Sequence, residues 1–249
     1  MIFHTFGNKE NKAVMFIHGM LTPWQIWNTA IEKFRNDYYV IVPELDAHTE
    51  NTPTAFHSIE EEAEKIREYI VNELEGKVFL LAGLSMGGRI AATLAKNEDI
   101  KIENLVLDGA PLGKLNLLMR AVTKSVYKSI IMKSKRHDAK TLEKAKKDFL
   151  PEDMLPYYIK IAENMIMESV GQIIDSVFSE FDMPKYRSGM RILYMHGTKG
   201  NETTVHKCAL KMKELNPQTE IRSFEGLAHA ELACFKPEQW TNEVEGFIS

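Results

Sequence analysis

The sequence predicts an α/β fold, a mostly parallel central sheet flanked by helices. Residues 13–17 form a short, continuous apolar run of the kind that a strand buried on both faces needs. Residues 58–74 carry apolar side chains on one helical stripe with glutamates opposite, which predicts an exposed amphipathic helix with a solvated acidic face. Residues 79–94 read as a strand, a very tight turn and a helix in direct succession. Strands that alternate with helices in this way favour a parallel sheet with helices on its faces.

Length and composition fit a globular protein without giving its function. The 249 residues suit one α/β domain with an insertion. The hydrophobic share of 44% and the charged share of 27% are ordinary, and the net charge of −4 gives no overall attraction to nucleic acid or anionic membranes. No apolar run is long enough to span a membrane, and the first residues lack an export signal. We expect neither a nucleic-acid partner nor a membrane span.

Cysteine usage indicates a reducing compartment, so we expect a cytoplasmic protein. Cys208 and Cys234 are the only cysteines, too few and wrongly spaced for a disulfide framework or a zinc site. We expect both to be small buried hydrophobes. No cluster of side chains has the spacing of metal ligands, so no metal and no organic cofactor is implied.

The first elements are predicted from apolar spacing. Residues 2–6 alternate weakly, which predicts an edge strand. Aromatic and apolar side chains recur at helical spacing from Trp24 to Ile31, after a Thr-Pro pair suited to a helix start. This helix should pack on the sheet, although Trp24 could instead line a substrate pocket. Further strands are expected at residues 38–42, 105–107, 191–197 and 220–224, and a closing helix at residues 235–248.

The turn at Ser85 carries the strongest chemical signal in the chain. An apolar strand stops at Gly83, Ser85 follows at the tip, and Gly87 leads into a helix. A serine in a strained turn needs small neighbours, and glycine stands two positions away on either side. With this Gly-x-Ser-x-Gly pattern between strand and helix, the chain resembles the α/β-hydrolase superfamily. The resemblance implies that Ser85 is a catalytic nucleophile.

The resemblance also implies an oxyanion hole. His18 and Gly19 end a strand where the family has a His-Gly pair, and the next residue, Met20, would lend a backbone N–H. Met86, directly after the nucleophile, would lend the second. Two fixed N–H groups stabilise charge on a carbonyl oxygen without reorganising. We expect His18 itself to be a core histidine bonded to the backbone.

A histidine near the C-terminal end of the chain is predicted as the general base. His229 lies in a loop of small residues, after the last expected strand and before the closing helix, as the base of the family does. Among the eight histidines, only this one fits the chain order nucleophile, acid, base. The resemblance implies that His229 takes the proton of Ser85.

The acid of the triad stays open between two carboxylates. In the family it is usually an aspartate in the loop after the strand expected at residues 191–197, but no aspartate follows Asp182. Glu202 is the only carboxylate in that loop, and glutamate can accept a hydrogen bond from the imidazole. Asp108, at the end of the preceding core strand, is the alternative. An incomplete triad is the third reading.

A helical segment is expected between two parts of the core. Residues 1–111 and 187–249 would form the hydrolase core, and residues 112–186, with no convincing strand, would form the cap, or lid, that the family carries there. Residues 114–148 hold eleven basic residues against three acidic ones. This charge has two interpretations, a solvated helical face or attraction of an anionic substrate, carrier or lipid surface.

The resemblance implies a serine hydrolase that cleaves a carboxylic ester, a thioester or a related small acyl substrate through an acyl-enzyme. Its partner would be that small acyl molecule, an anionic one if the lid charge acts on it. Two other classes stay open. One is a lyase or carbon–carbon bond hydrolase with the same triad, and the other is a ligand-sensing protein of this fold with little turnover. The natural substrate and the oligomeric state cannot be read from the sequence.

Overall fold

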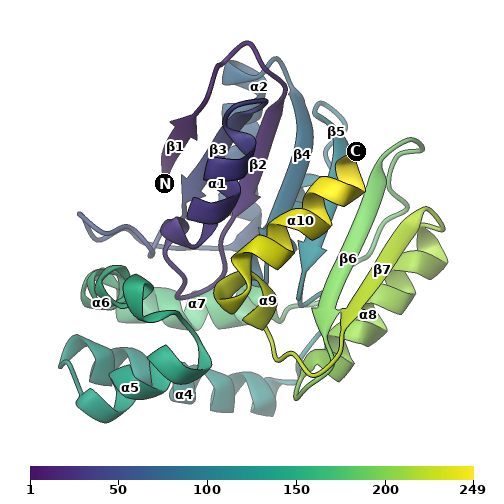
Figure 1. The fold of residues 1–249 in the computed structure, drawn as a ribbon. Helices are drawn as coiled ribbons and strands as arrows, with labels where there is room; N and C mark the ends of the chain where they lie inside the picture. The colour runs from purple at the N-terminus through teal and green to yellow at the C-terminus, as the bar shows by residue number, and fades with distance from the viewer.

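A seven-stranded sheet forms the centre of the protein, which a computed structural model describes over residues 1–249 (Figure 1). Its strands are β1 (Ile2–Phe6), β2 (Ala13–Ile17), β3 (Tyr39–Glu44), β4 (Lys77–Leu84), β5 (Lys101–Asp108), β6 (Arg191–Gly197) and β7 (Thr219–Phe224). Their order in the sheet is β1-β3-β2-β4-β5-β6-β7. Only β1 runs antiparallel to its neighbour, β3, and all other neighbouring pairs are parallel. The predicted mostly parallel sheet is confirmed.

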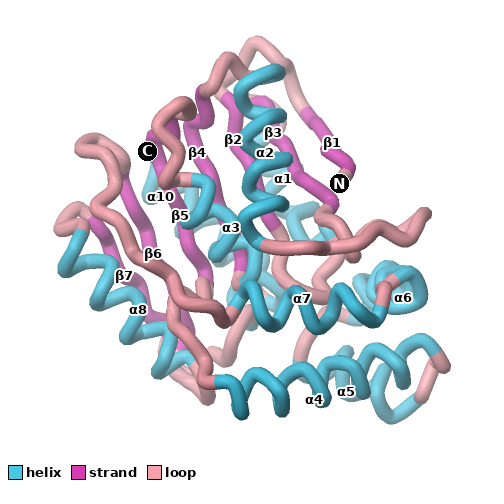
Figure 2. The backbone as a smooth tube through the Cα atoms, turned by 180° about the vertical axis from the view of Figure 1, so that it is seen from behind, coloured by secondary structure: helices cyan, strands magenta, loops and turns pink.

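Helices cover both faces of the sheet. One face carries α1 (Asn28–Phe34) and α10 (Pro237–Ile248), as Figure 1 shows. The view from behind shows α2 (Ile59–Glu73), α3 (Met86–Leu94) and α8 (Glu202–Leu215) on the other face (Figure 2). The short α9 (Glu231–Phe235) leads into α10. Because both faces are covered, every residue of β2 is buried, which explains the unbroken apolar run in the sequence.

The predicted helix near Trp24 is present, but its start differs in detail. It begins as a short 3-10 turn over Trp24–Trp27 that runs directly into α1, no side chain caps it, and the hydroxyl of Thr22 donates to Gly19 O at 2.8 Å. The prediction that the glutamates of α2 are solvated is wrong for one of them. Glu62 is buried and accepts from the backbone N–H of Asp46 at 3.1 Å. This carboxyl therefore belongs to the core, and burial raises the pKa of Glu62 to about 7.

Residues 112–186, here called the helical insertion, contain helices and no strand, as the sequence predicts. They lie beyond the carboxyl ends of the strands, at the lower edge of Figures 1 and 2. The helices are α4 (Leu117–Lys135), α5 (Ala139–Asp148), α6 (Leu155–Asn164) and α7 (Met167–Val177), with a 3-10 turn over Glu152–Met154. Asn116 and Asp138 cap α4 and α5, each accepting from a backbone N–H at 2.9 Å.

The insertion has an inner and an outer layer. The inner layer consists of α6 and α7, and α7 is bonded to the core segment that enters α2: Ser169 Oγ accepts from the N–H of Phe56 at 3.0 Å, and Ser176 Oγ accepts from that of Ile59 at 2.8 Å. The outer layer, α4 and α5, packs on α6, on α7 and on itself. No hydrogen bond or ion pair joins a residue of α4 or α5 to the sheet or to the helices that cover it.

A buried arginine joins both ends of the insertion to the helix that follows Ser85. Arg89 of α3 donates to Pro111 O at 3.4 Å, just before the insertion starts, and to Ser179 Oγ at 3.1 Å and Glu180 O at 3.2 Å near its end. The guanidinium also lies 4.4 Å from the ring centroid of Phe181. No carboxylate pairs with it, so backbone carbonyls and one hydroxyl provide its hydrogen bonds.

Candidate active site

The turn at Ser85 is as tight as its glycines predict. Ser85 adopts φ 52° and ψ −114°, a strained conformation for a residue with a side chain, between β4 and α3. A Cβ on Gly83 would lie 2.3 Å from Gly87 O, and one on Gly87 would lie 2.3 Å from Ile17 O. Neither position has room for a side chain. The backbone of the turn therefore lies directly against the end of β2, with the Ser85 hydroxyl at its tip.

Three predicted residues meet in one chain of hydrogen bonds. The hydroxyl of Ser85 donates to His229 Nε2 at 2.8 Å, and His229 Nδ1 donates to Glu202 Oε1 at 2.7 Å. The second oxygen of Glu202 accepts from the N–H of Gly197 at 2.8 Å. The Glu202 side chain is 1% exposed, whereas that of His229 is 27% exposed. A fixed, buried carboxylate thus orients an imidazole that solvent can reach.

Glu202 stands at the start of α8 and not in a loop as predicted. At the first turn of a helix, the orphan N–H groups and the helix dipole stabilise negative charge. The loop of His229 is held against the segment before α8, because Leu227 O accepts from the N–H groups of Thr198 and Lys199, each at 3.0 Å. These contacts fix the distance between acid and imidazole.

Asp108, the alternative acid, is buried beside this chain but bonded elsewhere. Its Oδ2 accepts from Trp240 Nε1 of α10 at 3.0 Å, and no hydrogen bond joins it to His229. Burial raises the pKa of Asp108 to about 7, and the neighbouring charge of Glu202 acts in the same direction. No local pattern signals the partner Trp240, which lies in the closing helix 132 residues further along the chain.

Asp108 should make the stability of the protein depend on pH. Its usual pKa of 3.8 applies in the unfolded chain, whereas the folded value is about 7, so the unfolded state loses this proton first as the pH rises. The contribution of Asp108 to stability therefore decreases as the pH rises from 3.8 to about 7, and it stays low at higher pH. Asp108→Asn, which cannot ionise, should be more stable than the wild type at pH 8, by about 1–4 kcal/mol.

The measurement is urea unfolding of both proteins at several pH values. The advantage of Asp108→Asn should shrink as the pH is lowered through 7 and vanish near the usual pKa of 3.8. The amide oxygen keeps an acceptor for Trp240, so the comparison isolates the charge. A stability difference that is the same at every pH would show that Asp108 does not titrate in this range.

The turn that carries Met20 lies beside the turn at Ser85. A Cβ on Gly19 would be 3.4 Å from Ser85 Cβ, which shows how closely the two segments approach. No acceptor within the chain takes up the N–H of Met20. Met86 supplies the first amide of α3, one of those that a helix leaves without an internal acceptor. Both predicted donors thus have backbone amides available, just after the carboxyl ends of the neighbouring parallel strands β2 and β4.

Two buried histidines shape this turn. His18 Nδ1 donates to Gly19 O at 2.9 Å, and its Nε2 accepts from the N–H of Leu45 at 3.2 Å, so it is the backbone-bonded core histidine that the sequence predicts. His48 Nε2 accepts from the N–H of Leu21 at 2.9 Å. Burial lowers the pKa of His18 to about 3 and that of His48 to about 4, so both rings are neutral and can accept. Sequence reasoning did not find the role of His48.

Trp24 is not brought to the site. Its indole stacks on the ring of His4 in β1, with centroids 4.1 Å apart, and tilts against Phe6 at 6.1 Å. The aromatic residue at the start of this segment is therefore explained by its packing on the edge strand β1. The prediction that Trp24 lines a substrate pocket therefore has no support from its surroundings.

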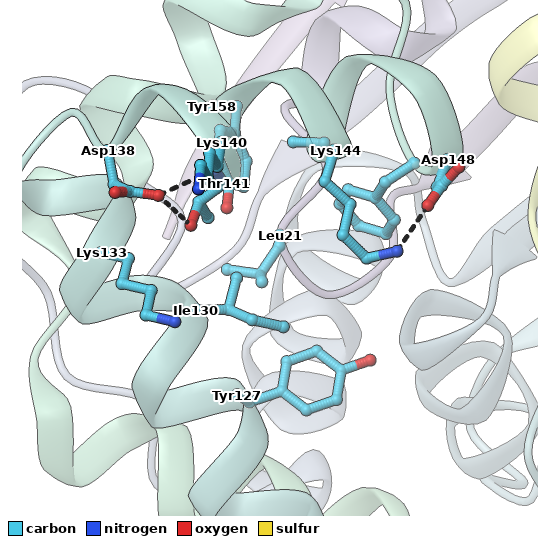
Figure 3. A pocket seen from close by; sticks show the side chains of 12 residues that line it. Leu21, Tyr127, Ile130, Lys133, Asp138, Lys140, Thr141, Lys144, Asp148 and Tyr158 are labelled. Carbon is cyan, nitrogen blue, oxygen red and sulfur yellow. Dashed lines mark hydrogen bonds and ion pairs between the residues drawn. The ribbon is translucent and has the colours of Figure 1, made fainter.

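A cavity of about 560 Å³ opens between the outer helices of the insertion and the turn after Met20 (Figure 3). This volume is in the range of small-molecule sites. Leu21 lines the cavity from the core side. Its apolar lining comes from Leu21, Tyr127, Ile130, Ala145, Phe149 and Tyr158. Its charged lining comes from Lys133, Asp138, Lys140, Lys144 and Asp148.

The charges of the cavity are only partly neutralised. Lys144 pairs with Asp148 at 2.7 Å, as Figure 3 shows, and Asp138 caps α5. Lys133 and Lys140 have no ion pair. An apolar cavity with two unpaired lysines at its rim suits a ligand with an apolar body and an anionic group. Ser85 and His229 do not line this space, and Leu21 is its link to the turn of Met20.

No group of three or more histidine, cysteine, aspartate or glutamate side chains is arranged to hold a metal ion. None of the helices combines the length and the apolar character needed to cross a lipid bilayer.

Comparison with known proteins gives the family. Residues 12–156, from the start of β2 into α6, match the family model described as alpha/beta hydrolase fold. The match covers more than half of the chain, and the protein therefore belongs to the α/β-hydrolase family. The resemblance inferred from the Gly-x-Ser-x-Gly pattern around Ser85 is confirmed.

Two curated relatives match part of the chain. An AB hydrolase superfamily protein of Gibberella zeae is 23% identical over 127 residues, 51% of this chain and 45% of the relative. A candidate 2-succinyl-6-hydroxy-2,4-cyclohexadiene-1-carboxylate synthase of Haemophilus influenzae is 29% identical over 103 residues, 40% of this chain and 41% of the relative. The matched segments span less than half of either relative.

Solved structures match the whole chain. An α/β-hydrolase family protein of Desulfitobacterium hafniense has a TM-score of 0.80 at 22% identity, with 100% of both chains covered. A thermophilic esterase of Thermogutta terrifontis reaches 0.73 at 19% identity, covering 99% of this chain and 92% of that one. MenH of S. aureus reaches 0.71 at 18% identity, covering 99% and 97%. At these identities the likeness shows the fold alone.

Proposed function

We propose that the protein is a serine hydrolase that cleaves a carboxylic ester, a thioester or a related small acyl substrate. The observation that carries this proposal is the hydrogen-bonded chain from Ser85 through His229 to Glu202, with contacts of 2.8 and 2.7 Å. A serine hydroxyl bonded to an imidazole, which a carboxylate orients in turn, is an arrangement that activates a nucleophile. The family and the esterase among its structural neighbours support the same reading.

In the proposed reaction, His229 Nε2 takes the proton of Ser85 while Oγ attacks the carbonyl carbon of the substrate. The negative charge that develops on the carbonyl oxygen is held by the N–H groups of Met20 and Met86. The imidazolium, stabilised by Glu202, gives its proton to the leaving group, and the acyl group stays on Ser85. A water molecule, deprotonated by His229, then releases the acid and restores the serine.

We further propose that residues 112–186 act as a cap that holds the substrate over Ser85. The cavity between α4, α5 and Leu21 would take the body of the acyl group. Its unpaired Lys133 and Lys140 favour a substrate with a carboxylate or a phosphate at the far end from the scissile bond.

A second candidate is a lyase that uses the same three residues to move a proton without forming an acyl-enzyme. The observation that favours it is the relative in Haemophilus influenzae, whose name describes a synthase that makes a succinyl-bearing carboxylate. An anionic product of that kind would also suit a cavity with lysines at its rim. Because the match spans 103 residues only, the hydrolase stands first.

The test of the proposal combines a probe with a substrate panel. A fluorophosphonate probe should lose fluoride and form a bond to Ser85 Oγ, which mass spectrometry of the labelled peptide can locate. A panel of p-nitrophenyl esters should be turned over by the same protein. Labelling together with turnover supports the hydrolase, and labelling without turnover favours the lyase. No labelling of Ser85 would contradict both candidates.

The charge of the cavity predicts a response to salt. For an ester with an anionic acyl group, kcat/KM should fall by up to about tenfold between low and physiological ionic strength, because screening shortens to about 8 Å at 0.15 M. A neutral ester of equal length should change little. Lys140→Gln should remove most of the difference between the two esters. Equal salt responses in the wild type would mean that the lysines are only solvated.

A further inference from the structure

The outer face of α4 exposes an unusual amount of apolar surface. Six of the eleven exposed large hydrophobic side chains of the chain lie on this one helix of 19 residues. They are Leu117, Leu118, Met119, Val122, Val126 and Met132. Single exposed apolar residues are normal on a protein surface, but a contiguous group marks a surface that contacts something.

Helical spacing arranges three members of this group as a continuous stripe. Leu118, Val122 and Val126 stand four residues apart, so they line up along one side of the helix. The opposite side carries the buried Ile131 and Ser134 and packs on α6 and α7. Figure 1 shows α4 at the lower edge of the molecule beside α5, with α6 and α7 between it and the sheet. The stripe therefore faces away from the protein.

Lysines flank the stripe on both sides. Lys124 and Lys128 line the groove between α4 and Met167 of α7. On the α5 side, Lys133 and Lys140 line the cavity of Figure 3. The helix itself has five basic residues and no acidic one. Lys124 pairs with Asp175, whereas Lys128, Lys133 and Lys140 have no ion pair.

We propose that the outer face of α4 docks on a lipid surface that carries anionic headgroups. An amphipathic helix with aliphatic side chains on one face and lysines beside them lies in the plane of a membrane interface, with its apolar face among the acyl chains. Lysines near such a surface are attracted by its negative potential. The whole chain has a net charge of −4, so the attraction is local to the insertion and orients the molecule with α4 toward the lipid.

The distribution of charge favours lipid over a second copy of the chain. In a symmetric dimer through this face, the segment with eleven basic and three acidic residues would face itself. Like charges would then oppose each other around the stripe. An anionic lipid surface accepts both the apolar stripe and the lysines. The lipid would also lie at the end of the molecule toward which the parallel strands run (Figure 1), and Ser85 directly follows β4 at that end.

The experiment measures binding of the full chain to vesicles by sedimentation. Vesicles of phosphatidylglycerol and phosphatidylcholine in equal parts are compared with vesicles of phosphatidylcholine alone. The protein carries Ser85→Ala, so no hydrolysis can alter the lipid, and the result does not depend on the proposed function. We expect binding to the anionic vesicles, weaker binding to the neutral ones, and a loss of the difference at high salt.

Variants separate the two parts of the surface. Lys128→Gln and Lys133→Gln should each weaken binding to anionic vesicles about fivefold, since a basic residue near the surface contributes about 1 kcal/mol. Val122→Glu should weaken it by about tenfold or more, because it removes apolar contact and adds a negative charge. The matched control is Leu210→Glu on α8, since Leu210 and Val122 are both 51% exposed. This control should bind as the parent does, and circular dichroism checks that each variant is folded.

The outcomes decide the proposal. Binding that needs anionic lipid and is lost in Val122→Glu but kept in Leu210→Glu supports it. Absence of binding to anionic vesicles overturns it, as does binding that Val122→Glu and Leu210→Glu weaken equally. A dimer in solution that Val122→Glu dissociates, without vesicle binding, also overturns it and makes the stripe an interface between copies of the chain.

Discussion

Ser85→Ala is expected to abolish ester turnover and probe labelling while the fold stays intact. Losing the nucleophile of a triad lowers kcat on the order of a million-fold, because the remaining groups have no atom to activate. Alanine fits the turn as well as serine does, since the flanking glycines and not the hydroxyl make room for it. The Ser85 hydroxyl bonds only to His229, so little stability should be lost.

The measurement pairs steady-state kinetics with urea unfolding. Ser223→Ala, at an exposed serine of β7, is the matched control and should keep both activity and labelling. A folded Ser85→Ala protein with the full activity of the wild type would remove Ser85 from the reaction, and with it the proposed function.

Glu202→Gln is expected to lower kcat by roughly 10⁴-fold. Glu202 accepts from His229 Nδ1 at 2.7 Å, which leaves Nε2 free to accept from Ser85. A glutamine can present its amide N–H to Nδ1 and so favour the wrong tautomer. It also removes the negative charge that stabilises the imidazolium.

Asp108→Asn is the matched control, because it neutralises a second buried carboxyl near the same imidazole. It should cost at most about tenfold in kcat, since Asp108 bonds to Trp240 and not to His229. The reverse pattern, with Asp108→Asn inactive and Glu202→Gln active, would make Asp108 the acid. Two equally active variants would argue against any carboxylate partner.

Much of the fold could be predicted because the central strands are buried on both faces. The run at residues 13–17 became β2 with the same bounds. The start of α8 could not be predicted, because its first turn is polar and its buried residues, Val205 and Cys208, appear later. Local spacing could not show whether Trp24 faced a pocket or the edge strand, since its partner His4 lies on a separate strand.

For the site, chain order pointed to Ser85 and His229, and the structure brings them within hydrogen-bond distance. The sequence left the choice between Glu202 and Asp108 open. Asp108 ends β5 and Glu202 follows β6, and the carboxyl ends of these adjacent parallel strands meet at one edge of the sheet. The two candidates are distinguished only by the direction in which each side chain points. The links from His48 to Leu21 and from Trp240 to Asp108 join distant segments, and no local pattern signals such contacts.

The two layers of the insertion and the buried Arg89 bear on how a substrate would enter and leave. Swinging the whole insertion away from the core would break the bonds of Arg89 at both hinges, together with those of Ser169 and Ser176. Moving α4 and α5 alone keeps these bonds and instead breaks those between the two layers, among them Ser134 Oγ with Tyr158 Oη at 2.8 Å and Lys135 Nζ with Glu163 O at 3.1 Å. We expect a displacement of the outer pair over a stationary inner pair to be the easier opening, because it leaves every bond between the insertion and the core in place. Gating would then be set by the contacts between the two layers, including the packing of Ile131 and the bond of Ser134, and bond-making by Ser85, so the two rates would be controlled by separate parts of the chain.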